Sequence, residues 1–344
     1  MKRSRFFSAG FSALLVLTAW SRLVSAAAVD ELVAAAKREG TLDLYAPSGL
    51  TPLGVQALAE AFNKKYNLST RLNYTAGHNF TGDVGKVVGF AAAGVAPEWD
   101  LMVIHDAGHA TLWRRNLHKP LEYRKLGVNP EMIHYDGGTI TFANQFALPA
   151  YNKKVLPARD APKSWEDLLD PKWKGGKLGI SNAVHHLARL ATVWGETRTT
   201  EFVKVLARQQ PFLGTLPELS TRLEMGEIHV AFTLLDSFIH RAKAAGAPIV
   251  FAEGIEPVIS PALHAGVLKG ARHPDGGHLF AAFLATPMAQ EIWEKYEGQS
   301  SALIPGTKAY KYAQGKTVLY MTQHQTEMMD RLTKDYGKIL GFVR

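Results

Sequence analysis

The segment Pro162-Lys-Ser-Trp-Glu-Asp-Leu-Leu-Asp-Pro-Lys-Trp-Lys-Gly-Gly176 lies at the middle of this chain of 344 residues and decides how the chain is divided. Ser164 is placed to cap a short helix, because a serine oxygen accepts a hydrogen bond from a free amide of the first turn. Trp165 and Leu168 are the apolar side chains that this helix would bury. Pro171 ends it, because proline has no amide hydrogen and restricts the residue before it. We therefore expect a rigid elbow between two halves of similar size.

The half before the elbow repeats one pattern three times. Predicted strands at 41–45, 69–74 and 100–104 are each followed by a polar loop and an amphipathic helix. This order favours a parallel sheet with helices on its faces, and such sheets bind ligands at the carboxyl ends of their strands. The residues expected along that rim are Ser48, Gly49, Gly77, His78, Asn79, His105, Asp106 and His109.

The half after the elbow has the same organisation, with predicted strands at 177–180 and 228–233 that lead into helices. The corresponding rim residues are Ser181, Asn182, His185, Asp236 and Ser237. Extended segments near 139–150 and 255–268 would carry the chain between the halves and form a hinge for closure around a ligand. The fold class predicted is α/β with two lobes, one of 29–142 plus 258–300 and the other of 143–257 plus 301–344.

Residues 1–28 have the pattern of a cleaved secretory signal: basic residues at the start, an apolar run from Phe11 to Trp20, and small residues at the end. The apolar run is too short to span a bilayer as a mature helix. Removal of its four basic residues, Lys2, Arg3, Arg5 and Arg22, takes the formal net charge from +8 to +4. The mature protein is then only mildly basic, which argues against nucleic acid as a partner.

The chain contains no cysteine, which excludes disulfides, thiolate metal sites and cysteine nucleophiles. A lipid-anchored bacterial lipoprotein would need a cysteine at the cleavage site. We therefore expect a protein that is free in the periplasm.

The elbow also carries a family resemblance. Tyr151-Asn152, the segment 162–176 and the Gly-Ile-Ser at 179–181 resemble the extracellular solute-binding proteins of ABC importers, in the group named for ferric-iron binders that also holds thiamine and phosphonate binders. Shorter matches, such as Ala96-Pro-Glu-Trp-Asp100, extend the resemblance over nearly the whole mature chain. It implies a type 2 periplasmic-binding fold, a small-molecule solute held between the lobes, ABC permease subunits as partners, a monomer, no resident cofactor and no catalysis.

The resemblance also bears on the ligand. Ferric-binding members use two adjacent tyrosines before an arginine-containing helix, and Ser237-Phe238 stand at that place when Arg241 is set against the helix. Neither residue ligates iron. Serine, asparagine and glycine at helix N-termini instead suit a carboxylate or phosphonate, because free amides and the positive helix end favour an anion. Arg189 or Arg241 would add charge.

Two alternatives stay open. The chain has 13 histidines, and His78, His105, His109 and His185 would supply a metal or metal-chelate site from the cleft loops. The segment Gly179-Ile-Ser181-Asn-Ala183 approaches the hydrolase elbow Gly-x-Ser-x-Gly, and Asp236 followed by His240 or His264 has the chain order of a triad, although the last glycine is missing. A secreted serine hydrolase that uses Ser181 is therefore the alternative of another class.

Overall fold

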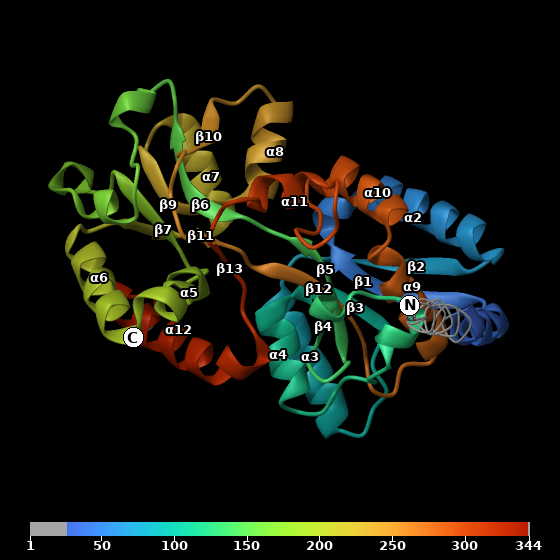
Figure 1. Cartoon of the computed structure of the whole chain (residues 1–344). Helices are drawn as coiled ribbons and strands as arrows, with labels where there is room; N and C mark the ends of the chain where they lie inside the picture. The colour runs from blue at the N-terminus through green and yellow to red at the C-terminus, as the bar shows by residue number, and fades with distance from the viewer. Residues whose placement is uncertain (1–25, 343–344) are drawn as a thin grey trace, which may run out of the picture.

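Two separate β-sheets, each covered by helices, make up the computed structural model, which describes residues 26–342 (Figure 1). They form two lobes that lie side by side and are joined by strands near the centre. The predicted leader lies outside the described residues except for 26–28, which begin a helix over 26–39. No helix within the described range is both long and apolar enough to cross a bilayer.

The sheet of the first lobe has the order β2-β1-β3-β12-β5-β4. Its strands are β1 (Thr41–Pro47), β2 (Arg71–Gly77), β3 (Leu101–His105), β4 (Ile133–His134), β5 (Thr139–Asn144) and β12 (Ala262–Val267). β1 pairs in parallel with β2 and with β3, which confirms the pattern of strand, loop and helix, and β12 runs antiparallel to both β3 and β5. Its helices are α2 (Thr51–Tyr66), α3 (Phe80–Ala92), α4 (Asp106–Trp113), α9 (Pro274–Leu284) and α10 (Pro287–Glu297).

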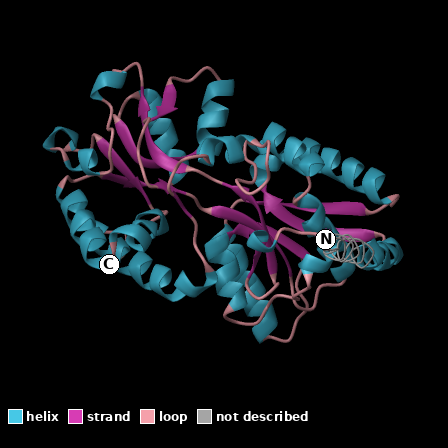
Figure 2. Ribbon diagram, in the orientation of Figure 1, coloured by secondary structure: helices cyan, strands magenta, loops and turns pink. Residues whose placement is uncertain are grey.

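The sheet of the second lobe has the order β13-β11-β6-β9-β7-β8, with β10 beside β6. Its strands are β6 (Ala147–Asn152), β7 (Leu178–Ser181), β8 (Phe212–Gly214), β9 (Val230–Leu235), β10 (Ile249–Phe251), β11 (Val258–Ile259) and β13 (Val318–Leu319). Its helices are α5 (His185–Trp194), α6 (Glu196–Arg208), α7 (Leu216–Met225), α8 (Asp236–Ala244), α11 (Lys308–Ala313) and α12 (Thr326–Leu340). Figure 2 shows helices on both faces of the strands, and the six residues of β9 are accordingly all buried.

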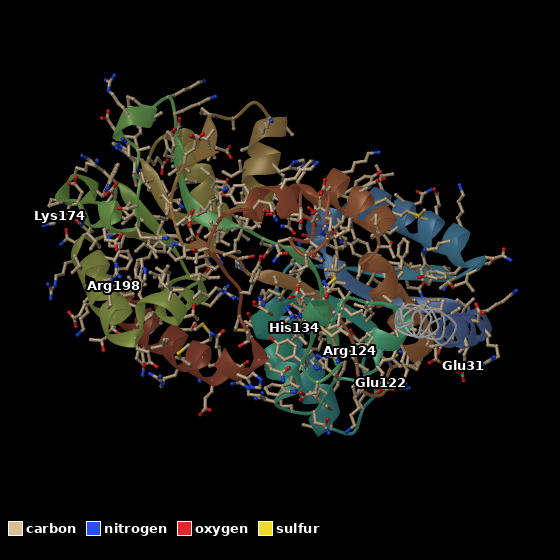
Figure 3. The ribbon with its side chains drawn as sticks, viewed as in Figure 1. Glu31, Glu122, Arg124, His134, Lys174 and Arg198 are labelled. Atoms are coloured by element: carbon tan, nitrogen blue, oxygen red, sulfur yellow. The ribbon has the colours of Figure 1, made fainter. Side chains whose placement is uncertain are left out.

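Charged side chains lie on the outside of both lobes. Lys174 and Arg198 extend from the outer edge of the second lobe, and Glu31 lies at the far end of the first (Figure 3). The C-terminal helix α12 packs against α5 and α6.

The elbow forms a 3-10 helix, Glu166–Leu169, rather than an α-helix. Ser164 caps it as predicted, because its Oγ accepts a hydrogen bond from the amide of Asp167 at 3.1 Å. Trp165 is fully buried, and its indole nitrogen donates to the carbonyl of Pro257 at 3.0 Å. The elbow is thus attached to the segment that carries the chain back to the first lobe.

Asn144 holds together the three segments that pass between the lobes. Its backbone amide donates to the carbonyl of Ser300 at 2.8 Å, and its side-chain nitrogen donates to Ser260 Oγ at 3.2 Å. Its side-chain oxygen accepts from the amide of Ala302 at 2.6 Å. The two predicted crossings and a third one near residue 300 therefore meet at one buried side chain.

Three buried histidines form a chain of contacts in the first lobe. His109 Nε2 lies 3.1 Å from the carbonyl oxygen of His264, which requires a proton on that nitrogen. A neutral His109 then accepts at Nδ1 from His118 Nε2, 3.0 Å away, and His118 Nδ1 remains bare and buried. Burial lowers the pKa of all three residues, that of His118 to about 4.

We expect these histidines to make the fold sensitive to acid. A pKa lowered on folding contributes stability above the unfolded value of about 6.5, and that stability is lost as the pH falls towards 4. For His118 alone the loss at pH 5 is on the order of 2 kcal/mol. Scanning calorimetry of wild type and His118→Asn at pH 7 and pH 5 tests this, because asparagine can still donate to His109. The melting temperature of the variant should fall less between the two pH values, and equal falls would contradict the prediction.

Candidate functional site

A cavity of about 840 Å³ lies between the lobes. The first lobe contributes the loop from β2 into α3 and the start of α4, and the second lobe contributes the starts of α5 and α7. Gln145 and Pro261, on two of the crossing segments, also line it. The cavity is therefore bounded by both lobes and by the hinge, as expected for a ligand site that closes.

Half of the predicted ligand residues line this cavity. They are Gly77, His78, Asn79, His105, Asn182 and His185. The residues outside the lining are Ser48, Gly49, Asp106, Ser181, Asp236 and Ser237.

The starts of α3 and α4 show how the rim residues are oriented. Asn79 Oδ1 accepts from the amide of Gly82 at 3.1 Å, and His105 Nδ1 accepts from the amide of Gly108 at 3.1 Å. Both side chains therefore cap their helices. Burial lowers the pKa of His105, and a neutral His105 that accepts at Nδ1 carries its proton on Nε2.

An ion pair joins the lobes at the cavity wall. Arg189 Nη2, from α5, lies 2.7 Å from Oδ1 and 2.6 Å from Oδ2 of Asp106, the first residue of α4. The two side chains are 2% and 1% exposed. Burial alone raises the pKa of Asp106, but the charge and hydrogen bonds of Arg189 outweigh it and hold that pKa below its usual value.

Arg189 lines the cavity with donors to spare. Within residues 26–342 its Nε and Nη1 are buried without a hydrogen-bond partner. His185 lies one turn earlier on the same helix, and its ring centroid is 5.8 Å from that of His105 on the other lobe. Burial, with the charge of Arg189, lowers the pKa of His185 to about 3. The wall thus presents uncharged imidazoles and a guanidinium.

Arg189 was not in the predicted ligand set, although the sequence analysis names it, with Arg241, as a residue that would add charge. The signal that could have placed it there is its position four residues after His185, on the helix that opens at a strand end.

The predicted residues outside the cavity include a second group between the lobes. The carboxylate of Glu297, at the end of α10, lies so close to Gly49 that a Cβ there would come within 2.7 Å of its Oε1. Glu297 is 5% exposed. Burial raises its pKa to about 7 and that of Asp236 to about 8, and the charge of Glu297 contributes to the second shift. Glu297 is not part of a recognisable sequence motif, so the sequence did not indicate that it lies in this group.

Glu297 is expected to weaken the fold as the pH rises. A carboxyl whose pKa is raised on folding penalises the folded state above its unfolded pKa of about 4.5, and the penalty reaches on the order of 3 kcal/mol at pH 8. Glu297→Gln removes this titration, so its melting temperature should gain on that of wild type between pH 5 and pH 8. Glu291→Gln, an exposed change on the same helix, is the control. A difference in melting temperature between Glu297→Gln and wild type that stays constant from pH 5 to pH 8 would contradict the prediction.

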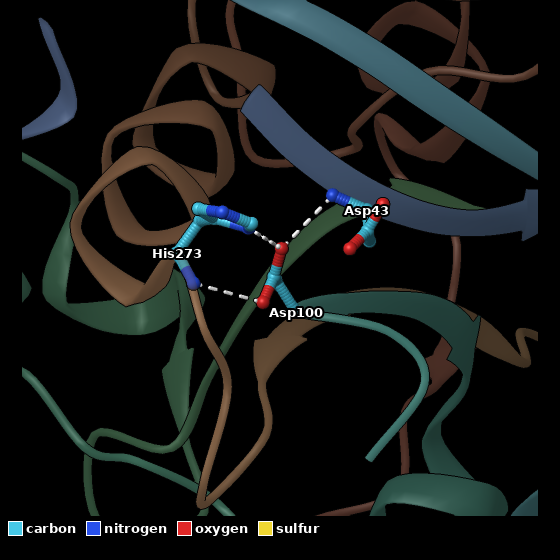
Figure 4. Close-up of side chains that lie close together, drawn as sticks. All are labelled: Asp43, Asp100 and His273. Atoms are coloured by element: carbon cyan, nitrogen blue, oxygen red, sulfur yellow. Dashed lines mark hydrogen bonds and ion pairs between the residues drawn. The ribbon is translucent and has the colours of Figure 1, made fainter. Parts of the chain in front are cut away.

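The four histidines of the metal alternative do not meet. His109 is fully buried and faces His118 and His264 instead of the cavity. Within the described residues, the group whose ligating atoms all lie within 4.8 Å of one another is Asp43, Asp100 and His273, on the first lobe (Figure 4). The prediction of a rim position for His109 was therefore wrong. His105 is the N-cap of α4 with an extended backbone, so the four-residue spacing of a helix does not place His109 beside it.

The group in Figure 4 is held by its own hydrogen bonds. Asp100 Oδ1 accepts from the amides of Arg272 and His273 at 2.7 and 2.9 Å. Its Oδ2 accepts from the amide of Asp43 at 2.9 Å and from His273 Nδ1 at 2.8 Å. A buried carboxylate with this many donors connects β1, β3 and the start of α9.

Asp100→Asn should therefore lower stability by about 3 kcal/mol, because the amide nitrogen would face donors that lose their acceptor. Urea unfolding measures the change. Asp43→Asn is the matched control, since the Asp43 side chain is half-buried and its Oδ1 accepts from Asn73. A rise in the melting temperature on addition of zinc that occurs in wild type and is lost in Asp100→Asn would show that this group binds metal.

The hydrolase triad is also not assembled within residues 26–342. Ser181 is 2% exposed, and the ring of His264 bonds to the hydroxyls of Thr139 and Thr141. The Asp236 carboxylate accepts from the amide of Ser237 instead of from a histidine. The structure therefore gives Ser181 no base.

Two α/β lobes with a cavity between them at the hinge define the class of two-lobed solute-binding receptors. This chain belongs to the family of bacterial extracellular solute-binding proteins, whose sequence profile matches residues 42–296. Type 2 periplasmic-binding proteins share its fold. This confirms the resemblance noted in the sequence.

Individual relatives are distant. Iron-bound HitA from Pseudomonas aeruginosa is 20% identical, with 86% of this chain and 99% of that chain covered and a TM-score of 0.68. AfuA from Actinobacillus pleuropneumoniae, solved with fructose-6-phosphate bound, is 18% identical, with 88% and 99% covered and a TM-score of 0.66. An uncharacterized protein of Haemophilus influenzae is 28% identical over 162 residues, 45% of this chain and 46% of that protein, so the match spans less than half of that relative. These similarities establish the fold and leave the solute open.

Proposed function

We propose that this protein is the periplasmic solute receptor of an ABC importer, and that it captures a small oxyanionic solute between its lobes and presents it to the permease. The observation that carries the proposal is Arg189, a cavity-lining guanidinium with two buried nitrogens that lack partners among residues 26–342. A buried donor without an acceptor is unfavourable, and an anionic oxygen is the acceptor that best relieves it.

Other features of the cavity support an anion. The N-termini of α3, α4 and α5 lie at its wall, and helix N-termini favour negative charge. Arg115 adds a second cation to the lining. The matched family consists of binding proteins, so we propose that the protein works as a monomer without catalysis.

AfuA, which has a sugar phosphate bound in its structure, is a fold relative whose ligand carries such an oxyanion. The same fold also holds iron in HitA. The solute class therefore has to come from the residues of this chain. The family resemblance sets Ser237 and Phe238, which lie outside the cavity lining, at the place of the tyrosine ligands of ferric-iron binders.

A metal chelate is the second candidate. The rings of His105 and His185 face each other across the cavity at 5.8 Å between centroids, and neutral imidazoles bind transition metals. A metal that kept an anionic chelator could use both histidines together with Arg189.

A thermal-shift screen of the metal-stripped mature protein decides between these candidates. The panel contains small carboxylates, phosphate esters, phosphonates, thiamine, ferric iron and zinc. We expect an oxyanion to raise the melting temperature, because a ligand at 100 times its Kd stabilises the folded state by about 2.7 kcal/mol. Arg189→Lys should lose most of that response, since one ammonium cannot keep the contact with Asp106 and also present the two further donors of the guanidinium. Arg241→Lys, an exposed change outside the cavity lining, should keep it.

A response to ferric iron or zinc alone would instead support the metal reading. Ester hydrolysis by wild type that disappears in Ser181→Ala would revive the hydrolase.

A further inference from the structure

The ion pair between Arg189 and Asp106 spans the two lobes. Asp106 is positioned by its own lobe, because its Oδ1 accepts from the amide of Ala107 at 2.7 Å and its carbonyl accepts from the hydroxyl of Tyr135 at 2.9 Å. Within the described residues, the side-chain hydrogen bonds of Arg189 go to Asp106 alone. The carboxylate of one lobe therefore sets the orientation of the guanidinium of the other.

Burial makes this contact dependent on closure. Each charged group is nearly inaccessible to water, and a buried charge is tolerated only when it is paired. Separation of the lobes would break the pair and return both groups to water. The pair is thus a contact of the closed form.

Two other polar contacts between the lobes are weaker. Arg114 on α4 pairs with Asp330 on α12, but both side chains are about one-third exposed, at 34% and 35%. Gln323 donates to Asp136 at 3.0 Å at an exposed position. Exposed pairs of this kind contribute little, because water and salt screen them.

We propose that Asp106 is a positioning residue that acts across the cleft. Its carboxylate draws the lobes together in the absence of solute and holds Arg189 by Nη2, so that Nε and Nη1 remain as separate donors toward the solute. Because Asp106 neutralises Arg189 and the neighbouring histidines are neutral, the solute is recognised through directed hydrogen bonds more than through net charge. The part about the solute rests on the proposed function, and the part about closure does not.

The chain has no cysteine, so a pair of introduced cysteines can be labelled without background. Val95→Cys on the first lobe and Met225→Cys on the second replace side chains that are 53% and 68% exposed. Single-molecule energy transfer between dyes at these positions reports the closed and open populations of the solute-free protein. The variants to compare are wild type, Asp106→Asn, Arg114→Gln, and the charge swap of Asp106→Arg with Arg189→Asp.

Solute-free wild type should show a closed population, and Asp106→Asn should lower the ratio of closed to open molecules at least tenfold. Arg114→Gln should change that ratio less than twofold, and the charge swap should recover part of the closed population. Asp106→Asn preserves shape, and circular dichroism checks that it folds. Solute-free wild type that is entirely open, or an Asp106→Asn distribution equal to that of wild type, would overturn the proposal.

The same labelled proteins separate this proposal from the proposed function. If closure depends on Asp106 but no oxyanion shifts the melting temperature, the pair stands and the solute class is wrong. If an oxyanion binds and Asp106→Asn leaves closure unchanged, the solute class stands and the role of the pair in closure is wrong.

Discussion

A guanidinium and a carboxylate that are hidden from water between two lobes set the shape of the cleft. Neither Arg189 nor Asp106 could be buried alone, because the desolvation of a single charge is not repaid by packing. Their mutual hydrogen bonds make the closed arrangement possible and, in the part of the chain that the structure describes, leave two nitrogens of Arg189 without partners. The geometry of the cavity wall thus follows from the contact that joins the lobes.

The local part of the fold could be predicted because its causes are local. Ser164 caps its turn with a side chain three residues from the amide it accepts from, and β1, β2 and β3 alternate with helices as their apolar patterns indicate. The polar residues at the ends of these strands were predicted from the same apolar patterns. The elbow forms a 3-10 helix because the stretch between Ser164, which caps it, and Pro171, which ends it, covers only residues 165–170.

The candidate site could be predicted only in part, because it depends on contacts between residues far apart in the chain. Gly49 and His105 both follow strands of one sheet, yet Gly49 lies against Glu297 and His105 lines the cavity. Arg189 and Asp106 are 83 residues apart, and the sequence pattern around either residue does not predict that it contacts the other. His109 lies in the core although His105 lines the cavity, because His105 is the N-cap of α4 and its side chain does not follow the helical spacing.

Asn144, which binds all three crossing segments, has a consequence for how the cleft moves. If the lobes rotate about this point, each atom is displaced in proportion to its distance from the axis of rotation. Gln145 and Pro261, next to the pivot, would then form a nearly fixed floor, while the wall farther out sweeps across the opening. A solute could rest on that floor before closure, so that first contact and final selection take place at different depths of one cavity.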